Sequence, residues 1–260
     1  MSRTQESLPK VSFIIPVLFL KRPINKSRFF MPRYTLPDVL RDLNENVTLP
    51  HEVIVVCNGQ DKELVEFVST HPHVDKYCLN NVNVGVARSW NMGAEMAEGE
   101  ILCYLNDDVA VGKNSIEELC GLLNDPMVGE VGPAGSYWVD LKHHSYVAGK
   151  EPVESDVISG FCFLVRATTF RQLGGFDIMF SPAGYEEIDF SFRIRQAGLK
   201  CIVHPNVDIR HFHHHGVSAQ KVNISYLGKT IDTEALHARN SMYFRQKWVN
   251  GFPSTIKIDQ

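Results

Sequence analysis

Three polar clusters in this 260-residue chain combine side chains that can take part in acid–base or metal chemistry. They are Asn106-Asp107-Asp108, Glu186-Glu187-Ile188-Asp189 and His211-Phe212-His213-His214-His215. Carboxylates bind Mg²⁺ together with substrate phosphates, imidazole binds transition metals, and an ionised glutamate can accept a proton. Each cluster also has a purely structural interpretation, so the surrounding sequence has to be weighed with it.

The Asn106-Asp107-Asp108 triplet directly follows the apolar segment 101–105, which predicts a buried strand. Open α/β sheets bind ligands beyond the carboxyl ends of their strands. Adjacent carboxylates repel each other, and a divalent cation with substrate phosphates would offset that repulsion. Asn-Asp-Asp is equally good turn chemistry, so the triplet alone leaves a turn and a metal site open.

The acidic cluster begins a segment whose spacing predicts a helix ending near Gln196. The positive end of a helix favours ionised carboxylates, as a general base requires. Asp189 lies four residues before Arg193, and we expect those two side chains to form a structural pair. Glu186 and Glu187 remain as candidates for the base.

The histidine cluster follows segment 207–209, whose alternation predicts a strand. Within a strand His211, His213 and His215 share one face and could bind a transition metal. A solvated loop is the alternative for 213–215. No cysteine has zinc-finger spacing to these histidines, which argues against a structural zinc site.

Two Asn-x-Gly triplets, Asn83-Val84-Gly85 and Asn91-Met92-Gly93, lie on either side of Arg88. Asn and Gly permit unusual backbone angles and close ligand approach, and Arg88 supplies a cation. A capped, well-packed helix explains the same pattern. The GxGxxG and GxxxxGK[ST] signatures of dinucleotide and P-loop sites do not occur.

Alternating strands and helices must position these clusters. Strand, helix, strand order over the first half predicts an α/β fold, a mostly parallel central sheet flanked by helices on both faces. The expected strands are 11–17, 52–57, 77–79, 101–105, 128–131, 157–166, 201–204 and 207–211. The expected helices are 38–46, 61–69, 86–98, 114–123, 167–173, 186–196 and 232–248.

Composition narrows the class of protein. A net charge of −4 argues against a nucleic-acid partner, and no apolar run approaches the roughly 18 residues of a transmembrane segment. The six cysteines lack C-x-x-C spacing, which favours free thiols in a reducing compartment. Residues 18–37 carry five basic residues and three prolines and predict a long loop.

Read in order from about Val11 to His211, the chain resembles family 2 glycosyltransferases of the GT-A fold. VSFIIPV is similar to the family's opening strand, EVIVVCNGQD to its V-D-N/D-G-S-x-D segment, NVGVARSWNMG with AEGE to its Asn-Gly helix, and LNDDV to its D-x-D strand end. ISGFCFLVR, LGGFD, GYEEIDFSFRIRQAG and HPNVDIRH resemble its acceptor-side half, and RNSMYFRQKW a terminal helix. Cys57, Asn106 and Glu187 stand where the family has aspartates.

The resemblance implies a single GT-A domain over 11–260, preceded by a loose segment at 1–10. Within that domain it implies a nucleotide-binding half at 11–110, an acceptor-side half at 111–215 and a C-terminal helical extension at 216–260.

The resemblance also implies metal-dependent, inverting transfer of a sugar from a UDP- or dTDP-sugar to a hydroxyl of a glycan, lipid-linked or other acceptor. Asp108 and His211 would hold Mn²⁺ or Mg²⁺. Glu187, with Glu186 as the alternative, would be the base, ionised at pH 7 if its pKa stays near the reference of about 4.3. The nucleotide side would be lined by Pro16, Asn58, Asn83, Arg88, Asn91, Asn106 and Asp107.

Two other functions stay open. A nucleotidyltransferase also uses a strand-end aspartate with a metal, but its glycine-rich loop has no counterpart in residues 18–37. A degenerate sugar-binding or nucleotide-binding family member is consistent with Cys57 and Asn106, although Asp108 and Glu187 are retained. We expect a cytoplasmic location, with loop 18–37 as the candidate for peripheral contact with the inner face of a membrane.

The histidines are expected to have unequal roles. His211→Ala should weaken Mn²⁺ binding because water must replace the imidazole, whereas His214→Ala and His215→Ala should change stability by less than about 0.5 kcal/mol. His213 shares the strand face of His211, so His213→Ala tests for a second ligand. Metal titrations of the four single variants measure this; equal losses in all four would indicate a diffuse histidine patch.

Overall fold

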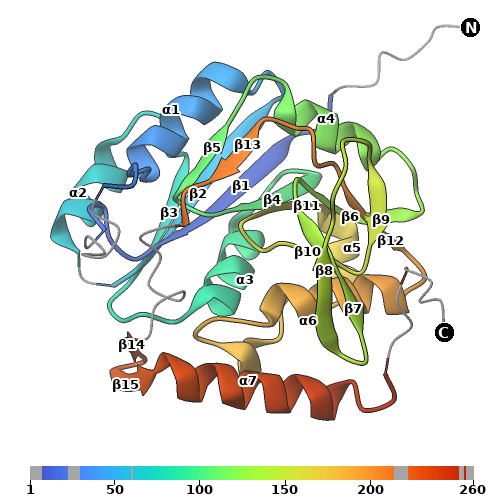
Figure 1. The fold of residues 1–260 in the computed structure, drawn as a ribbon. Coiled ribbons are helices and arrows are strands. Elements are labelled where there is room, and N and C mark those ends of the chain that lie inside the picture. Colours follow the sequence, from blue (N-terminus) through green and yellow to red (C-terminus); the bar gives the residue numbers. More distant parts are fainter. Residues whose placement is uncertain (1–7, 23–29, 60, 214–221, 252–254, 256–260) are drawn as a thin grey trace, which may run out of the picture.

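The computed structural model describes residues 8–22, 30–59, 61–213, 222–251 and 255. The strands of its central sheet are β1 (Val11–Val17), β2 (His51–Asn58), β3 (Lys76–Asn80), β4 (Ile101–Leu105), β6 (Val128–Gly132), β9 (Val153–Ser155), β11 (Cys162–Arg166) and β12 (Lys200–Val203). These form an eight-stranded sheet in the order β3-β2-β1-β4-β11-β6-β12-β9 (Figure 1). Four of the seven neighbouring pairs are parallel, including all those that join β3, β2, β1 and β4.

Helices cover both faces of this sheet, which confirms the predicted α/β architecture (Figure 1). They are α1 (Leu36–Asn46), α2 (Lys62–Thr70), α3 (Val86–Met96), α4 (Ser115–Leu122), α5 (Ala167–Gln172), the short 3₁₀ helix η2 (Ile178–Phe180), α6 (Glu186–Gln196) and α7 (Thr233–Lys247). Side chains of β1 alternate between two cores. Phe13 and Ile15 pack in the core with α1, α2 and α4, whereas Ile14 packs in the core with α3, α5 and α6. Because both faces are buried, the strand sequence is almost continuously apolar.

Smaller sheets join the central one among the described residues. Their strands are β5 (Val109–Val111), β7 (Gly135–Val139), β8 (Lys142–Tyr146), β10 (Val157–Ile158), β13 (Ile209–His211), β14 (Asn223–Tyr226) and β15 (Lys229–Asp232). They form a β10-β7-β8 sheet, a β13-β5 pair and a β14-β15 hairpin. Strand β5 directly follows the acidic triplet at the end of β4, and its pairing with β13 brings His211 close to that triplet.

The single strand expected over 157–166 is wrong. The chain changes sheets here: β10 pairs with β7, and β11 pairs with β4 and β6. Ser159, in the turn between them, donates its backbone N–H to the Ala134 carbonyl. The run is apolar on both sides of the turn because both strands are buried, and this hides the break from a periodicity argument.

The other predicted elements follow the predicted order with boundaries shifted by a few residues, whereas β7, β8 and β9 are not among the predicted strands. The extension expected to be helical at 216–260 contains the β14-β15 hairpin ahead of α7, and β5 was not predicted because it has three residues. All six cysteines are unpaired, as expected. Within the described part of the chain, none of the helices combines the length and apolarity needed to cross a bilayer.

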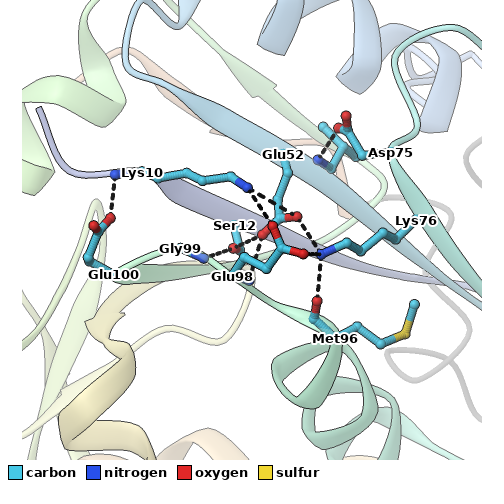
Figure 2. A network of polar contacts seen from close by, with 10 residues as sticks. Lys10, Ser12, Glu52, Asp75, Lys76, Met96, Glu98, Gly99 and Glu100 are labelled. Carbon is cyan, nitrogen blue, oxygen red and sulfur yellow. Dashed lines mark hydrogen bonds and ion pairs between the residues drawn. The ribbon is translucent and has the colours of Figure 1, made fainter.

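A buried carboxylate ties the amino ends of the parallel strands together (Figure 2). Glu52 on β2 accepts hydrogen bonds from the Ser12 hydroxyl at 2.6 Å and from the Glu98 backbone N–H at 2.7 Å. Its other oxygen lies 2.9 Å from Lys76 Nζ and 3.5 Å from Lys10 Nζ. Burial would raise the pKa of Glu52, but the Ser12 and Lys76 hydrogen bonds outweigh it and lower the pKa to about 2.

Replacing Glu52 should therefore destabilise the fold in a pH-dependent way. Glu52→Gln should lower the free energy of unfolding at pH 7 by about 2 kcal/mol, the size expected for lost hydrogen bonds to a charged group. Because the folded pKa is depressed from 4.5 to about 2, the loss should be full above pH 4.5 and shrink as the pH falls toward 2.

Urea unfolding of both proteins between pH 2 and 7 measures this difference. Glu98→Gln is the matched control, since Glu98 pairs with the same two lysines but its side chain is 66% exposed. It should change stability little. An equal loss in both variants would contradict the role of the buried carboxylate.

Candidate functional site

A hollow of about 250 Å³ opens beyond the carboxyl ends of β1, β2 and β4. This is the place where the sequence predicts a ligand site, because parallel strands end there together. The residues predicted from the sequence that line it are Pro16, Asn58, Asn83, Asn106, Asp107, Asp108 and His211. Gly85, Pro182 and Ala183 close one side.

Antiparallel pairing of β5 with β13 brings His211 to the acidic triplet. The register places His211 opposite Val109, and the Phe212 N–H donates to the Asp108 carbonyl at 2.8 Å. His211 Nε2 consequently lies 3.2 Å from Asp108 Oδ1. The Phe161 ring stacks on the imidazole with centroids 4.6 Å apart, which fixes its plane.

Asp108 and His211 form a donor pair that fits a divalent cation. Asp108 Oδ1 is buried and accepts no hydrogen bond from the described residues, although it faces the imidazole nitrogen. A carboxylate oxygen and an imidazole nitrogen are both ligands for such ions. No group of three or more His, Cys, Asp and Glu side chains forms a metal site among the described residues, so bound substrate or water would complete the coordination.

Arg22 is a site residue that the sequence did not predict. Its Nη1 lies 2.5 Å from Asp108 Oδ2, and its Nη2 contacts Asp107 Oδ1. Burial would lower the pKa of this guanidinium, but the two carboxylates raise it above its usual value. The signal available in the sequence was a basic pair directly after the first strand, inside a loop that begins at this edge of the sheet.

The two aspartates respond differently to this environment. Burial together with the charge of Asp108 raises the pKa of Asp107, even though Arg22 opposes the rise. Burial also acts to raise the pKa of Asp108, but His211 and Arg22 outweigh it and lower the pKa. Asp108 is therefore the carboxylate that stays ionised most readily, which suits a metal ligand.

Asparagines at the ends of β2 and β3 complete one wall. Asn58 is buried and donates from its amide to Ser89 Oγ at 2.6 Å. The Asn83 amide oxygen accepts from the Gly85 N–H at 2.9 Å, while its amide nitrogen donates to the Ser225 carbonyl of β14 at 2.9 Å. Gly85 has φ +84°, and a Cβ there would lie 2.7 Å from Pro182 Cα. The close approach of this turn to Pro182 therefore requires glycine.

Arg88 and Asn91 do not line the hollow. Arg88 Nε lies 3.4 Å from the Tyr226 hydroxyl of β14. Asn91 exchanges two hydrogen bonds with the backbone of Phe176, at 2.8 and 2.9 Å, and so holds the turn that contains Gly175. The structure thus engages both side chains in supporting contacts and does not bring them to the site.

The acidic cluster begins α6, after the segment with Pro182 and Ala183; like Arg88 and Asn91, the predicted Glu186 and Glu187 are not among the residues that line the hollow. Glu186 is buried, and burial together with the charge of Glu187 raises its pKa well above 4.5. Glu187 is half-buried beside Gly160, where a Cβ would lie 3.1 Å from Glu187 Cγ. Burial raises the pKa of Glu187 as well, so the expectation of a reference pKa is wrong.

Asp189 is structural, as predicted. It is fully buried and accepts from Arg193 Nε at 2.9 Å and from Trp248 Nε1 at 3.0 Å. Lys247 Nζ lies 2.9 Å from its Oδ1. These bonds attach the end of α7 to α6.

A second attachment from α7 fixes the turn ahead of the acidic cluster, and it was also missed from the sequence. The buried Asn240 amide nitrogen lies 2.6, 3.0 and 2.8 Å from the carbonyl oxygens of Phe180, Ala183 and Gly184. Arg239 donates to the Ser181 carbonyl at 2.5 Å. The contacts join residues far apart in the chain, so no local pattern could have predicted them.

Comparison with known proteins assigns the family. The model of "Glycosyl transferase family 2" matches residues 33–168, just over half of the 260 residues, and the chain belongs to that family. The O-antigen biosynthesis protein RfbC of Myxococcus xanthus is 26% identical over 245 residues, covering 81% of this chain and 18% of that protein. Polypeptide N-acetylgalactosaminyltransferase 4 of Mus musculus is 23% identical over 195 residues, covering 62% and 34%. The chain spans less than half the length of these relatives.

Solved structures give the same fold. GalNAc-T7 with UDP, GalNAc and Mn²⁺ superposes with a TM-score of 0.67 at 18% identity, over 94% of this chain and 49% of that one. The mannosyltransferase PcManGT of Pyrobaculum calidifontis with GDP-Man and Mn²⁺ gives 0.55 at 19% identity, over 78% and 56%. The fold is therefore GT-A, as the sequence motifs predicted.

Proposed function

We propose that the chain transfers a sugar from a nucleotide-sugar donor to a hydroxyl acceptor, with a divalent cation held by Asp108 and His211. The observation that carries the proposal is the 3.2 Å approach of His211 Nε2 to a buried Asp108 oxygen in a hollow at the strand ends. The Mn²⁺ and nucleotide named for both similar structures support it. Membership of a glycosyltransferase family favours this reaction over nucleotidyl transfer.

Residues that line the hollow would bind the donor. When bound, the cation would offset the charge of the diphosphate and of the departing nucleotide. Pro16 and Asn58 lie at the ends of adjacent strands and would contact the nucleoside, with Asn83 beside them. A UDP-sugar or a dTDP-sugar is the donor that we propose first.

The acceptor side would use Glu187. A carboxylate whose pKa is raised by burial is a stronger base than an exposed one. Its oxygen would take the proton of the acceptor hydroxyl as that hydroxyl attacks the anomeric carbon opposite the diphosphate, which inverts the configuration. Glu186 beside it is more deeply buried, and burial raises its pKa well above the usual value.

The acceptor that we propose is a glycan or lipid-linked hydroxyl, in line with the O-antigen relative. Two basic residues of loop 18–37 are already paired with carboxylates, Lys21 with Glu63 and Arg22 with the aspartates. Lys26 and Arg28 lie outside the described residues. A peripheral membrane contact would therefore gain little from Lys21 and Arg22.

The donor can be identified by thermal-shift screening of UDP, dTDP, GDP and CDP with and without Mn²⁺. The correct nucleotide should stabilise the protein by about 2.7 kcal/mol at a hundredfold excess over Kd. Asp108→Ala should abolish the Mn²⁺-dependent part of the shift without unfolding the protein. A shift that is the same in Asp108→Ala would contradict the metal assignment. Binding without turnover of any nucleotide sugar would support a degenerate family member.

The base can be tested by removing its charge at constant shape. Glu187→Gln should lower sugar transfer by about 10² to 10⁴-fold while nucleotide binding survives. Because burial raises the pKa of Glu187, wild-type transfer should fall as the pH drops through a value above 4.5. Rates from pH 5 to 8 with Glu186→Gln as the matched variant measure this. A larger loss in Glu186→Gln would move the base by one residue.

A further inference from the structure

Arg22 pairs with one oxygen of Asp108, the carboxylate whose other oxygen faces His211 and would hold the divalent cation. It contacts Asp107 Oδ1 and lies 2.5 Å from Asp108 Oδ2, with its side chain only 17% exposed. His211 approaches the other oxygen of Asp108. Asp108 therefore lies between a guanidinium and an imidazole, which approach different oxygens of its carboxylate.

The position of Arg22 is built into the fold by contacts on both sides of it. The Leu20 N–H donates at 2.8 Å to Asp61 Oδ2, the side chain that caps α2. Arg33 donates to the Arg22 carbonyl at 2.7 Å. The backbone is thus held at α2 and from residue 33, while the guanidinium reaches into the hollow.

Charge balance in the hollow gives Arg22 a second partner. The two carboxylates and the guanidinium sum to one negative charge, and a divalent cation changes this sum to one positive charge. The excess would attract an anionic diphosphate. A guanidinium binds two phosphate oxygens with the same fork geometry that it uses for carboxylates. Arg22 lines the same hollow as Asn58 and Asp108, so it is within reach of that diphosphate.

We propose that Arg22 is a charge-exchange residue of the donor site: it competes with the divalent cation for the charge of Asp108, and it pairs with the donor diphosphate once the cation has taken that carboxylate. The proposal rests on the proposed function, because the diphosphate is that of a nucleotide sugar. It makes metal binding and nucleotide binding mutually reinforcing, since each step frees a partner for the other.

Arg22→Met tests the proposal because it keeps an unbranched stem and removes the guanidinium. Mn²⁺ binding without nucleotide should tighten about tenfold, and UDP or GDP binding at saturating Mn²⁺ should weaken about tenfold, the size of one charge-assisted hydrogen bond. The spectroscopic signal of free Mn²⁺ gives the first affinity, and titration calorimetry gives the second. Lys21→Met is the matched control, since it removes the same charge one residue away, and both affinities should change less than twofold.

Charge exchange predicts that the two affinities of Arg22→Met change in opposite directions, with tighter binding of Mn²⁺ and weaker binding of the nucleotide. A displaced loop would weaken both affinities in Arg22→Met, and that result would overturn the proposal, as would an unchanged Mn²⁺ affinity or an unchanged nucleotide affinity. Arg22→Lys covers the case in which Arg22→Met does not fold: one ammonium cannot span both carboxylates, so Mn²⁺ should again bind more tightly, with an intermediate loss of nucleotide affinity.

Wild-type protein separates this inference from the function on which it rests. Failure of wild type to bind any nucleoside diphosphate with Mn²⁺ would overturn the proposed function and the diphosphate half of the inference. The competition between Arg22 and Mn²⁺ would still be decided by the metal titration, which needs no nucleotide.

Discussion

Two adjacent carboxylates in a buried hollow need partners, and the architecture around the end of β4 supplies a guanidinium and an imidazole. Asp107 and Asp108 are 6% and 2% exposed, so water cannot screen their repulsion. Arg22 reaches them from the loop after β1, and His211 from the β13-β5 pair. The partners come from segments far apart in the chain, so the site exists only in the folded protein.

The buried carboxylates at the two ends of the parallel strands differ in how completely they are paired. At the amino ends, Glu52 has both oxygens engaged by Ser12, Lys76 and neighbouring groups, so that network is closed. At the carboxyl ends, Asp108 keeps a buried oxygen that accepts no hydrogen bond from the described residues. A closed network stabilises a fold, whereas an incompletely paired one is suited to binding, and this contrast supports the proposed site at the carboxyl ends of the strands.

Local patterns predicted the parts of this structure that depend on neighbours in sequence. The buried strand before Asn106, the helix that begins at Glu186 and the Asp189–Arg193 pair all follow from spacing alone. His211 as a site residue came from its place in an ordered series of motifs. Arg22 could not be predicted because the path of a long loop decides where its side chain lies. Asn91 lies in a motif typical of a ligand site, but its side-chain amide is hydrogen-bonded to the backbone of Phe176.

Burial changed the chemistry expected of the acidic cluster. A glutamate at a helix start would ordinarily have a low pKa, because the helix dipole favours its charge. Desolvation at the start of α6 outweighs that effect for Glu186 and Glu187. Sequence spacing reports the dipole but not the packing, so the direction of the shift could be seen only in three dimensions.

The attachment of α7 to the turn at 180–184 has an evolutionary consequence. The segment matched by the family model, 33–168, includes Asp108 but ends before Glu187 and Asn240. One amide on α7 lies at hydrogen-bond distance from three carbonyls of this turn, so a substitution on the outer helix can shift the start of α6 together with Pro182 and Ala183, which line the hollow. Drift in the last helix can therefore move a wall of the hollow and the acidic cluster together while every residue of both is kept.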